Sequence, residues 1–448
     1  MACEVEWIPL GDIVNLSSGG TPDKKQPAYW DGEIPWISAK TLTGDTVTTS
    51  NLFITEEGLH AGSKLAPVGS ILLLTRGSGL FKRIPLAIVN APVAYNQDVK
   101  CMTSKVATIT NEYVFFALKA LSPELTNMLE TTGIGAGKLA TDRLLDMPIP
   151  VLSHDEREKA VSFFSALSRK IMINNRINDY LANLCETIAG KYCNDRNSCL
   201  RDICYQVTDH VDYGNANQET YVSTESLMQN KGGRQLASSL PTAGKITRYK
   251  AGDTLISNIR PYFKKIWYAP FEGTCSGDVI VFRANDPSNA PYLHACLRQD
   301  SFFDYVMQGA KGTKMPRGDK KQMMEFKVAS SCSTKDLILL DSAIKQRSDN
   351  DSETVKLQAL RDTLLPKLMS GEIDVSKVDL TQLTNNHLWV HGHNVPNRYW
   401  KGRLWKPSLI MFCHRCRTCS IRHSSNIWPK YSESRYCQLR KHPCRRIC

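Results

Sequence analysis

The sequence predicts an α+β protein built from two similar globular domains and two long helices. Three features support this class. A set of short motifs occurs twice, about 180 residues apart. Each copy mixes short β-type runs with turn signals. Each copy is also followed by a long helical stretch with a regular apolar stripe.

The repeated motifs keep the same order along the chain. The four pairs are Trp36–Leu42 with Tyr221–Leu227, Gly69–Leu73 with Gly252–Ile256, Asn96–Val99 with Ser276–Val279, and Lys138–Leu139 with Lys314–Met315. Their offsets are 185, 183, 180 and 176 residues, a gradual drift that small loop deletions would produce. A period this long is not that of a solenoid, so it indicates a duplicated domain.

Turn signals and short β-type runs predict a first domain over residues 1–152 and a second over residues 195–332. In the first domain, Gly19–Pro22 is a typical turn and Ser70–Leu74 a typical buried strand. A helix is expected near Asn111–Leu121, because the strand pattern gives way there to a longer apolar segment.

Two long helices are expected over residues 153–194 and 333–378, each opened by a Ser-x-x-acid motif that begins at Ser153 or Ser333. The first stripe consists of Phe164, Leu167, Ile171, Asn174, Asn178, Leu181, Cys185 and Ile188. The second stripe consists of Leu337, Leu340, Ile344, Arg347, Asp351, Leu357, Leu360 and Leu364. Pro366 is expected to kink or end the second helix.

Neither helix can bury its apolar stripe alone. The simplest arrangement is an antiparallel coiled coil, which would place the two domains at opposite ends, related by a pseudo-twofold axis. The alternative is that each helix packs separately on its own domain.

Composition favours a cytoplasmic protein without a membrane span. No apolar run approaches the ~20 residues that cross a bilayer, and the start of the chain lacks a signal peptide. The nine cysteines before residue 380 are scattered and odd in number, which is typical of reduced thiols.

The net charge of +12 comes from the last segment alone. Residues 381–448 contain 13 Lys or Arg and one acid, Glu433, whereas the preceding residues carry 43 basic and 43 acidic groups. Residues 379–448 are also rich in Cys, His and Trp and lack apolar periodicity. They are interpreted as a read-through or frameshifted tail. A non-specific basic DNA-contacting tail or a zinc site with ligands such as Cys413, Cys416 and Cys419 are the alternatives.

Within the balanced part of the chain, positive charge gathers in loops of the two domains and not in the helices. Such loops contact phosphates along nucleic acid, although the alternative of ordinary solvated loop lysines stays open. The candidate DNA-binding residues are Lys40, Arg76, Lys82, Arg83, Lys138, Arg234, Lys245, Arg248, Arg260, Lys264, Lys265, Lys314 and Arg317.

No catalytic motif accompanies these basic loops. Thr132–Leu139 is Gly-rich, but a phosphate loop needs Gly where Thr132 stands and Ser or Thr where Leu139 stands. The segment therefore predicts a flexible turn. The sequence has no base-methylation motif, nuclease carboxylate set or nucleophile elbow, so we expect a recognition protein and no catalytic residue or metal site.

Several motifs, taken in order, resemble the specificity (S) subunit of type I restriction-modification enzymes. They are Trp7–Ile13, Ser18–Pro22, Tyr29–Ser38, Asn96–Val99, Met147–Pro150 and Leu360–Ile373. The resemblance covers residues 1 to about 378. It departs where Ser153–Arg157 replaces the usual start of the first helix, and nothing in the family accounts for residues 381–448.

The resemblance implies that the two domains are target-recognition domains, each reading one half of a bipartite sequence in double-stranded DNA. The helices would set the gap and dock the methyltransferase subunits. The chain itself would need no cofactor, since AdoMet, ATP and Mg²⁺ would belong to the methyltransferase and the restriction/translocase subunits. The alternative function is a coiled-coil scaffold whose globular ends bind protein partners.

Overall fold

The computed structural model describes residues 5–133, 135–192, 197–312 and 314–374. These residues belong to one compact unit of the chain and mix helices with strands, as the sequence predicts. The tail expected over residues 379–448 lies outside the described residues, and so do its candidate zinc ligands.

The first globular part, residues 5–152, is built around a five-stranded sheet in the order β2-β11-β7-β9-β4. These strands are β2 (Val14–Ser18), β11 (Val99–Ser104), β7 (Ile71–Leu74), β9 (Leu86–Val89) and β4 (Thr46–Val47). All four residues of β7 are buried, because this central strand is covered on both faces.

Three smaller sheets complete the first part. The first contains β5 (Phe53–Ile54), β3 (Trp30–Ile37), β10 (Val93–Tyr95) and β6 (Lys64–Ala66). The second contains β12 (Glu130–Thr131), β13 (Gly137–Lys138) and β8 (Arg76–Gly77). The third is the pair β1 (Glu6–Pro9) and β14 (Pro148–Val151). The helical segments are α1 (Leu10–Ile13), η1 (Pro27–Tyr29), α2 (Glu56–Gly62), η2 (Ser78–Phe81), α3 (Asn111–Ala120), α4 (Ser122–Asn127) and α5 (Thr141–Asp146). Helix α3 confirms the helix expected near Asn111.

The second globular part, residues 197–332, contains a four-stranded sheet in the order β16-β22-β19-β20. The strands are β16 (Cys204–Gln206), β22 (Val279–Ala284), β19 (Thr254–Ser257) and β20 (Ile266–Tyr268). Two further sheets contain β17 (His210–Asp212), β18 (Lys245–Tyr249) and β21 (Gly273–Cys275), and the pair β15 (Ser198–Cys199) and β23 (Lys327–Val328). The helical segments are α7 (Leu200–Ile203), η3 (Tyr213–Asn215), η4 (Pro261–Phe263), η5 (Pro287–Asn289), α8 (Ala290–Leu297), α9 (Asp300–Gln308) and α10 (Lys320–Met324).

The repeated motifs fold alike in both parts. The Ser38 amide donates to Thr41 Oγ1 at 2.8 Å, and the Ser223 amide donates to Ser226 Oγ at 2.7 Å. The last motif pair differs from the expectation. Lys138 pairs with Arg76 of β8, whereas Ile259, at the matching position of the second part, pairs with Arg317. The counterpart of Lys138 is therefore Arg317 and not Lys314, because backbone pairing decides the match.

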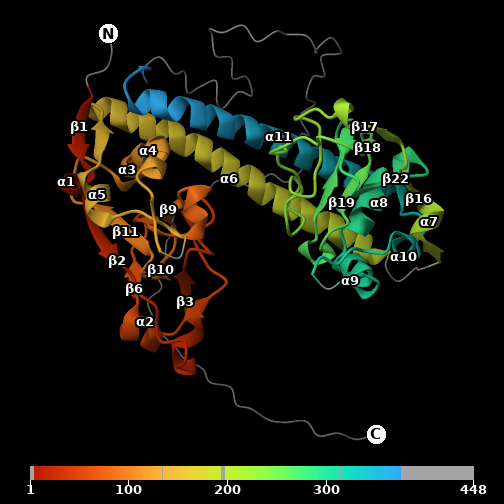
Figure 1. The fold of residues 1–448 in the computed structure, drawn as a ribbon, viewed down its shortest axis with the longest axis horizontal. Helices are drawn as coiled ribbons and strands as arrows, with labels where there is room; N and C mark the ends of the chain where they lie inside the picture. The colour runs from red at the N-terminus through yellow and green to blue at the C-terminus, as the bar shows by residue number, and fades with distance from the viewer. Residues whose placement is uncertain (1–4, 134, 193–196, 313, 375–448) are drawn as a thin grey trace, which may run out of the picture. The chain divides into compact units, whose positions relative to one another are not determined.

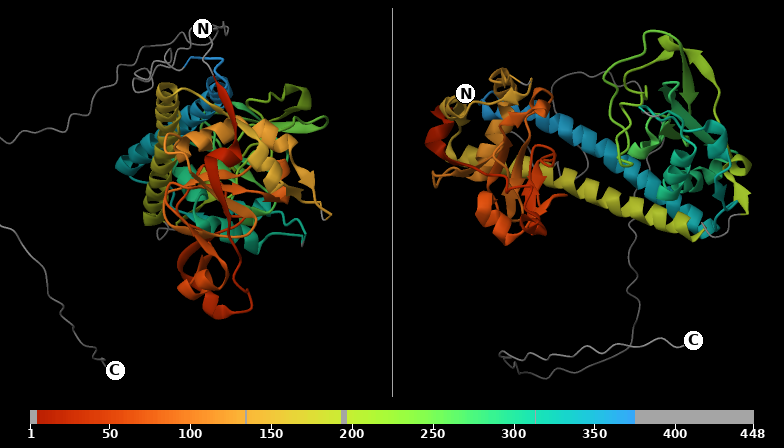
Figure 2. Two further views of the ribbon diagram at one scale, coloured as in Figure 1. Left: turned by 90° about the vertical axis from the view of Figure 1, so that its left-hand side faces the viewer. Right: turned by 60° about the horizontal axis from the view of Figure 1, so that its bottom comes forward.

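Two long helices, α6 (His154–Lys191) and α11 (Thr334–Met369), lie side by side and run antiparallel (Figure 1). The two further views in Figure 2 show the same pairing. Residues Phe164, Leu167 and Ile171 of α6 share one core with the end of α11 and the first globular part. The other end of α6 shares a second core with the start of α11 and the second part. Each helix therefore packs against both globular parts. Within the described ranges, every helix is too short or too polar to serve as a membrane span.

Polar side chains occupy the middle of the seam between α6 and α11. Asn350 Nδ2 donates to Asn178 Oδ1 at 2.8 Å, and Asn174 Nδ2 donates to Glu353 Oε2 at 2.9 Å. Both asparagines of α6 were expected in the stripe and are buried. On α11 the buried polar residues are Asn350 and Thr354.

One expected seam position on α11 was wrong, and of the two outcomes expected at Pro366, a kink or an end, the end does not occur. Asp351 is exposed, although its carboxylate still accepts a hydrogen bond from Asn178 Nδ2 at 2.7 Å. Its neighbour Asn350 takes the buried position, since a 3.6-residue period drifts against a regular seven-residue repeat. Pro366 does not end α11, which continues to Met369. The burial of Leu368 and Met369 offsets the backbone hydrogen bond that proline removes.

His294 of α8 is a buried titratable group in the core of the second part. Its Nδ1 lies 3.2 Å from Thr254 Oγ1, and its ring packs 5.2 Å from the ring of Tyr268. Burial, together with the positive charges of Arg298 and Arg347, holds the pKa of His294 well below its usual range. The folded protein therefore keeps this imidazole neutral.

The unfolded chain binds a proton on His294 more tightly than the folded chain does. The free energy of unfolding should therefore decrease as the pH falls below about 6.5, the ordinary pKa of histidine. We expect a slope of up to about 1.4 kcal/mol per pH unit from this group. Denaturant unfolding between pH 7.5 and about pH 5 should show a shallower pH dependence for His294→Gln than for the parent chain. Identical slopes would contradict the assignment. The matched control is His154→Gln, at a histidine whose side chain is 64% exposed.

Candidate nucleic-acid interface

The thirteen candidate DNA-binding residues divide by exposure. Nine are exposed, namely Lys40, Arg76, Lys82, Arg83, Lys138, Lys245, Arg248, Lys314 and Arg317. Four are half-buried, namely Arg234, Arg260, Lys264 and Lys265. Exposure leaves the first group free to meet a phosphate backbone, whereas the second group is committed in part to contacts within the protein.

In the first part, the structure brings the candidates together around one hairpin, residues 75–84, called here the first tip. Arg76 on β8 pairs with Lys138 on β13, which places both cations on neighbouring strands. Lys82 and Arg83 follow directly on the same hairpin. Lys40 follows Ala39 in the chain, and Ala39 lies close to the first tip. The Cβ atom of Ala39 is 3.7 Å from the position that a Cβ atom on Gly77 would occupy. Residues far apart in sequence thus form one basic surface.

The second part has a corresponding hairpin, residues 258–264, called here the second tip. Its base matches the first: the Thr75 amide donates to Asp98 O at 2.8 Å, and the Asn258 amide donates to Asp278 O at 2.8 Å. Arg317 packs beside this hairpin through its pairing with Ile259. Arg317 also forms an ion pair of 3.1 Å with Asp278, so part of its charge is balanced.

Three candidates of the second part lie away from the second tip. Lys245 and Arg248 belong to β18, in a separate sheet. The Arg234 guanidinium lies over the rings of Trp267 and Phe271, at 5.4 and 5.5 Å from their centroids. Burial lowers the pKa of Arg234. Its side chain therefore holds a loop together as well as carrying charge.

Several candidate cations have partners inside the protein. Lys265 Nζ donates to Thr224 O at 2.5 Å, and burial lowers its pKa. An Arg83 Nη donates to Thr43 O at 2.5 Å. Lys264 Nζ lies 2.7 Å from Asp300 Oδ1. These residues remain predicted DNA contacts, but each also anchors its own hairpin.

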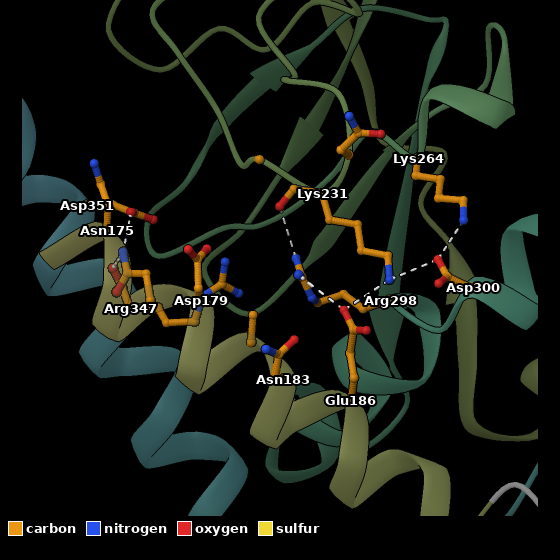
Figure 3. Close-up of a pocket in the computed structure, with 14 residues that line it drawn as sticks. Asn175, Asp179, Asn183, Glu186, Lys231, Lys264, Arg298, Asp300, Arg347 and Asp351 are labelled. Atoms are coloured by element: carbon orange, nitrogen blue, oxygen red, sulfur yellow. Dashed lines mark hydrogen bonds and ion pairs between the residues drawn. The ribbon is translucent and has the colours of Figure 1, made fainter. Parts of the chain in front are cut away.

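A cleft of about 700 Å³ separates the middle of α6 from the second tip (Figure 3). Lys231 Nζ lies 3.0 Å from Glu186 Oε1 and 3.1 Å from Asp300 Oδ1. Arg298 lies 3.3 Å from the same Glu186 oxygen. Figure 3 shows this chain of ion pairs running from α6 to Lys264, so it ties the second tip to the long helix.

Backbone strain marks the loops along this cleft. Asn230, Lys231, Arg260 and Lys264 all have left-handed backbone conformations, with φ of 54°, 60°, 50° and 50°. Non-glycine residues adopt this region at a cost of about 1–2 kcal/mol each. The ion pairs and the backbone hydrogen bond from the Lys231 amide to Lys264 O, 2.8 Å long, help to hold it.

The sequence interpretation missed two exposed aromatic residues at these tips. Phe81 is 49% exposed and Tyr262 is 46% exposed. A usable signal was present, since each hairpin carries an aromatic residue followed by two cations, at Phe81–Arg83 and Phe263–Lys265. Aromatic residues beside cations are common where proteins meet nucleic-acid bases.

The Gly-rich segment near Lys138 forms a hairpin. The Thr132 amide donates to Ala136 O at 2.8 Å, and Thr131 pairs with Gly137. Gly135 has a φ of 76°, a conformation that favours glycine. In the described part of the chain, no cluster of three or more His, Cys, Asp or Glu side chains is placed to hold a metal ion.

Residues 4–183 match the family described as the Type I restriction modification DNA specificity domain. A curated relative is the specificity subunit of the type I restriction enzyme EcoR124I/EcoR124II from Escherichia coli, 33% identical over 173 residues, or 38% of this chain and 43% of that protein. Another is the MjaIX specificity subunit from Methanocaldococcus jannaschii, 27% identical over 180 residues, or 39% of this chain and 40% of that protein. The match thus spans less than half the length of these relatives.

Solved structures of the same kind align over more of the chain. The type I restriction-modification S subunit from M. genitalium covers 82% of this chain and 96% of its own, at 14% identity and a TM-score of 0.47. The HsdS subunit from Thermoanaerobacter tengcongensis covers 82% of this chain and 97% of its own, at 13% identity and a TM-score of 0.32.

Over residues 4–183, these matches agree with the resemblance to specificity subunits that the sequence motifs indicate. The curated relatives are named as specificity subunits of type I restriction enzymes.

The ion pairs in the cleft lead to a stability prediction. Glu186→Gln would leave Arg298, whose side chain is 5% exposed, without a carboxylate, and would leave Lys231, whose side chain is 11% exposed, with Asp300 alone. Breaking such a pair costs on the order of 3 kcal/mol. Denaturant unfolding should show this loss. Glu158→Gln on the same helix, with a side chain 73% exposed, should change stability by less than about 0.5 kcal/mol. Equal effects of the two changes would contradict the role of Glu186.

Proposed function

We propose that the chain is the sequence-specific DNA-binding subunit of a type I restriction-modification complex, with each globular part reading one half of a bipartite target. The observation that carries the proposal is the pair of corresponding basic tips, one in each globular part. Two similar surfaces on one chain suit a target made of two separate half-sites in double-stranded DNA.

Matched hydrogen bonds support descent of both parts from one duplicated domain. Tyr113 donates to Pro150 O at 2.9 Å, and Tyr292 donates to Ala329 O at 3.2 Å, in each case a few residues before the long helix begins. The main sheets share the strand order β2-β11-β7-β9 and β16-β22-β19-β20. We propose target-recognition domains over 1–152 and 195–332, with spacer helices over 153–194 and 333–378.

The paired helices are proposed to act as an antiparallel coiled-coil spacer. Because each globular part shares a core with both α6 and α11, the length of the helices would fix the separation of the tips. A rigid pair of helices sets a distance better than a flexible linker does.

The outer face of α6 supports docking of a protein partner. Ile173, Ile177 and Tyr180 are 42%, 40% and 60% exposed and follow a helical spacing of four and three residues. We assign this stripe to the methyltransferase subunits, which would bring AdoMet, while the restriction/translocase subunits would bring ATP and Mg²⁺. A pure protein scaffold would share this stripe but would not need the basic tips.

The DNA-binding proposal is tested by salt dependence. In complex with its methyltransferase subunit, the chain should lose affinity steeply between about 50 and 200 mM salt, because phosphate contacts release counterions. Arg76→Ala should weaken binding to all sequences alike and lower the slope of log K against log salt by about 1. Lys345→Ala, on the exposed face of α11, should leave the slope unchanged. Affinity independent of salt in the parent complex would refute the proposal.

The spacer proposal is tested by length. Inserting one heptad between residues 176 and 177 and one between residues 351 and 352 should lengthen the helix pair by about 10 Å. The recognised gap should grow by about three base pairs, and both half-sites should stay the same. Selection from a DNA library with variable gaps measures this. A parent-length gap in the lengthened protein would show that the helices do not set the distance.

A further inference from the structure

The two tips each expose one aromatic ring beside cations. We propose that Phe81 and Tyr262 are the base-contacting residues of the two tips, so that each sets the sequence preference of one half-site. The inference rests on the proposed DNA-binding function and names residues that would determine its specificity.

The hairpins that carry these residues correspond to each other. Each closes with the same backbone hydrogen bond, from the Leu74 amide to Pro85 O at 3.0 Å and from the Ser257 amide to Lys265 O at 3.1 Å. Within the turn, Phe81 corresponds to Phe263, and the exposed ring of the second tip is its neighbour Tyr262. The two tips thus present different aromatic rings on hairpins of different length that are closed by corresponding hydrogen bonds.

Each exposed ring is held outward by an anchored neighbour. Leu80, directly before Phe81, is fully buried, and Pro261, directly before Tyr262, is buried as well. The Tyr262 ring is further supported by the Phe263 ring, whose centroid lies 4.6 Å away. A ring held in place at the surface loses little conformational entropy when it contacts a partner.

A second hairpin supports each tip from the side. A Cβ on Gly137 would stand 3.1 Å from Leu80 Cβ and 3.4 Å from Phe81 Cε2, so the Gly-rich hairpin packs directly against the first tip. In the second part, the Arg260 amide donates to Pro316 O at 2.8 Å. Both rings are therefore preorganised, which lowers the entropy lost on binding.

The cations around the rings identify the partner as DNA. Arg76 and Lys138 lie on adjoining strands beside Phe81, and Arg317 and the exposed Lys311 pair beside the second tip. Cations suit phosphates, and such contacts position a protein on the duplex. An aromatic ring gains nothing from a phosphate but can contact a thymine methyl group or enter a base step. The rings are therefore placed to read sequence while the cations hold the backbone.

The test uses the full chain in complex with its methyltransferase subunit and two DNA libraries, each with one half-site randomised. Phe81→Ala should lower the preference for one half-site at least tenfold and leave the other unchanged, and Tyr262→Ala should do the reverse. Phe81→Tyr should retain most of the preference, since the ring remains.

Two matched controls separate base contact from surface exposure. Val68→Ala removes a residue 60% exposed at the opposite end of β7, and Tyr205→Ala removes a tyrosine 46% exposed on β16. Both controls should keep both preferences. If Phe81→Ala and Tyr262→Ala also keep both half-site preferences while the parent complex binds selectively, this inference is wrong and the proposed DNA-binding function still stands. Loss of both half-site preferences from either single change would overturn this inference too. A parent complex without selective binding would instead overturn the proposed function.

Discussion

The apolar seam between α6 and α11 is the contact on which both globular parts depend. At one end Phe163 and Phe164 of α6 pack with Phe116 of α3 and with Leu365 of α11, in a single core. At the other end Cys185 and Ile188 share a core with α8 and with Leu340. Each globular part thus shares its largest hydrophobic core with both helices, while a further core in each part, around Tyr95 or Tyr249, contains no helix α6 or α11 residue.

Between these two cores the seam becomes polar. Asn174, Asn178 and Asn350 are buried, and each finds a hydrogen-bond partner on the facing helix. A buried amide without a partner costs about 1–3 kcal/mol. Sliding one helix by a heptad would separate Asn178 from Asn350, so the polar centre favours one alignment. Apolar ends supply affinity between the helices, and the polar centre supplies alignment.

Charged residues of the helices form internal ion pairs, whereas most charged residues of the tips are exposed. Charged residues of the long helices pair with residues of the globular parts. Glu186 of α6 forms an ion pair with Lys231 of the second part, and Arg361 of α11 forms an ion pair of 2.7 Å with Asp45 of the first part. These contacts hold the hairpins in place. The exposed cations Arg76, Lys138 and Lys314 stay available at the surface. A recognition surface of this kind needs stiff loops, because flexible ones would lose binding energy when ordered.

Local sequence determined the long helices, the first of their capping boxes, the α3 helix and the repeat, because these features depend on periodicity and on neighbours a few residues away. The Ser153–Glu156 box and the buried Asn174 and Asn178 were predictable for that reason. Only the tertiary structure decided that Arg317 matches Lys138, that Asn350 replaces Asp351 in the seam, and that α11 continues past Pro366. It also decided which cations are held by internal partners and which aromatic rings remain exposed. Those outcomes depend on contacts between segments far apart in the chain, where burial and pairing outweigh local preference.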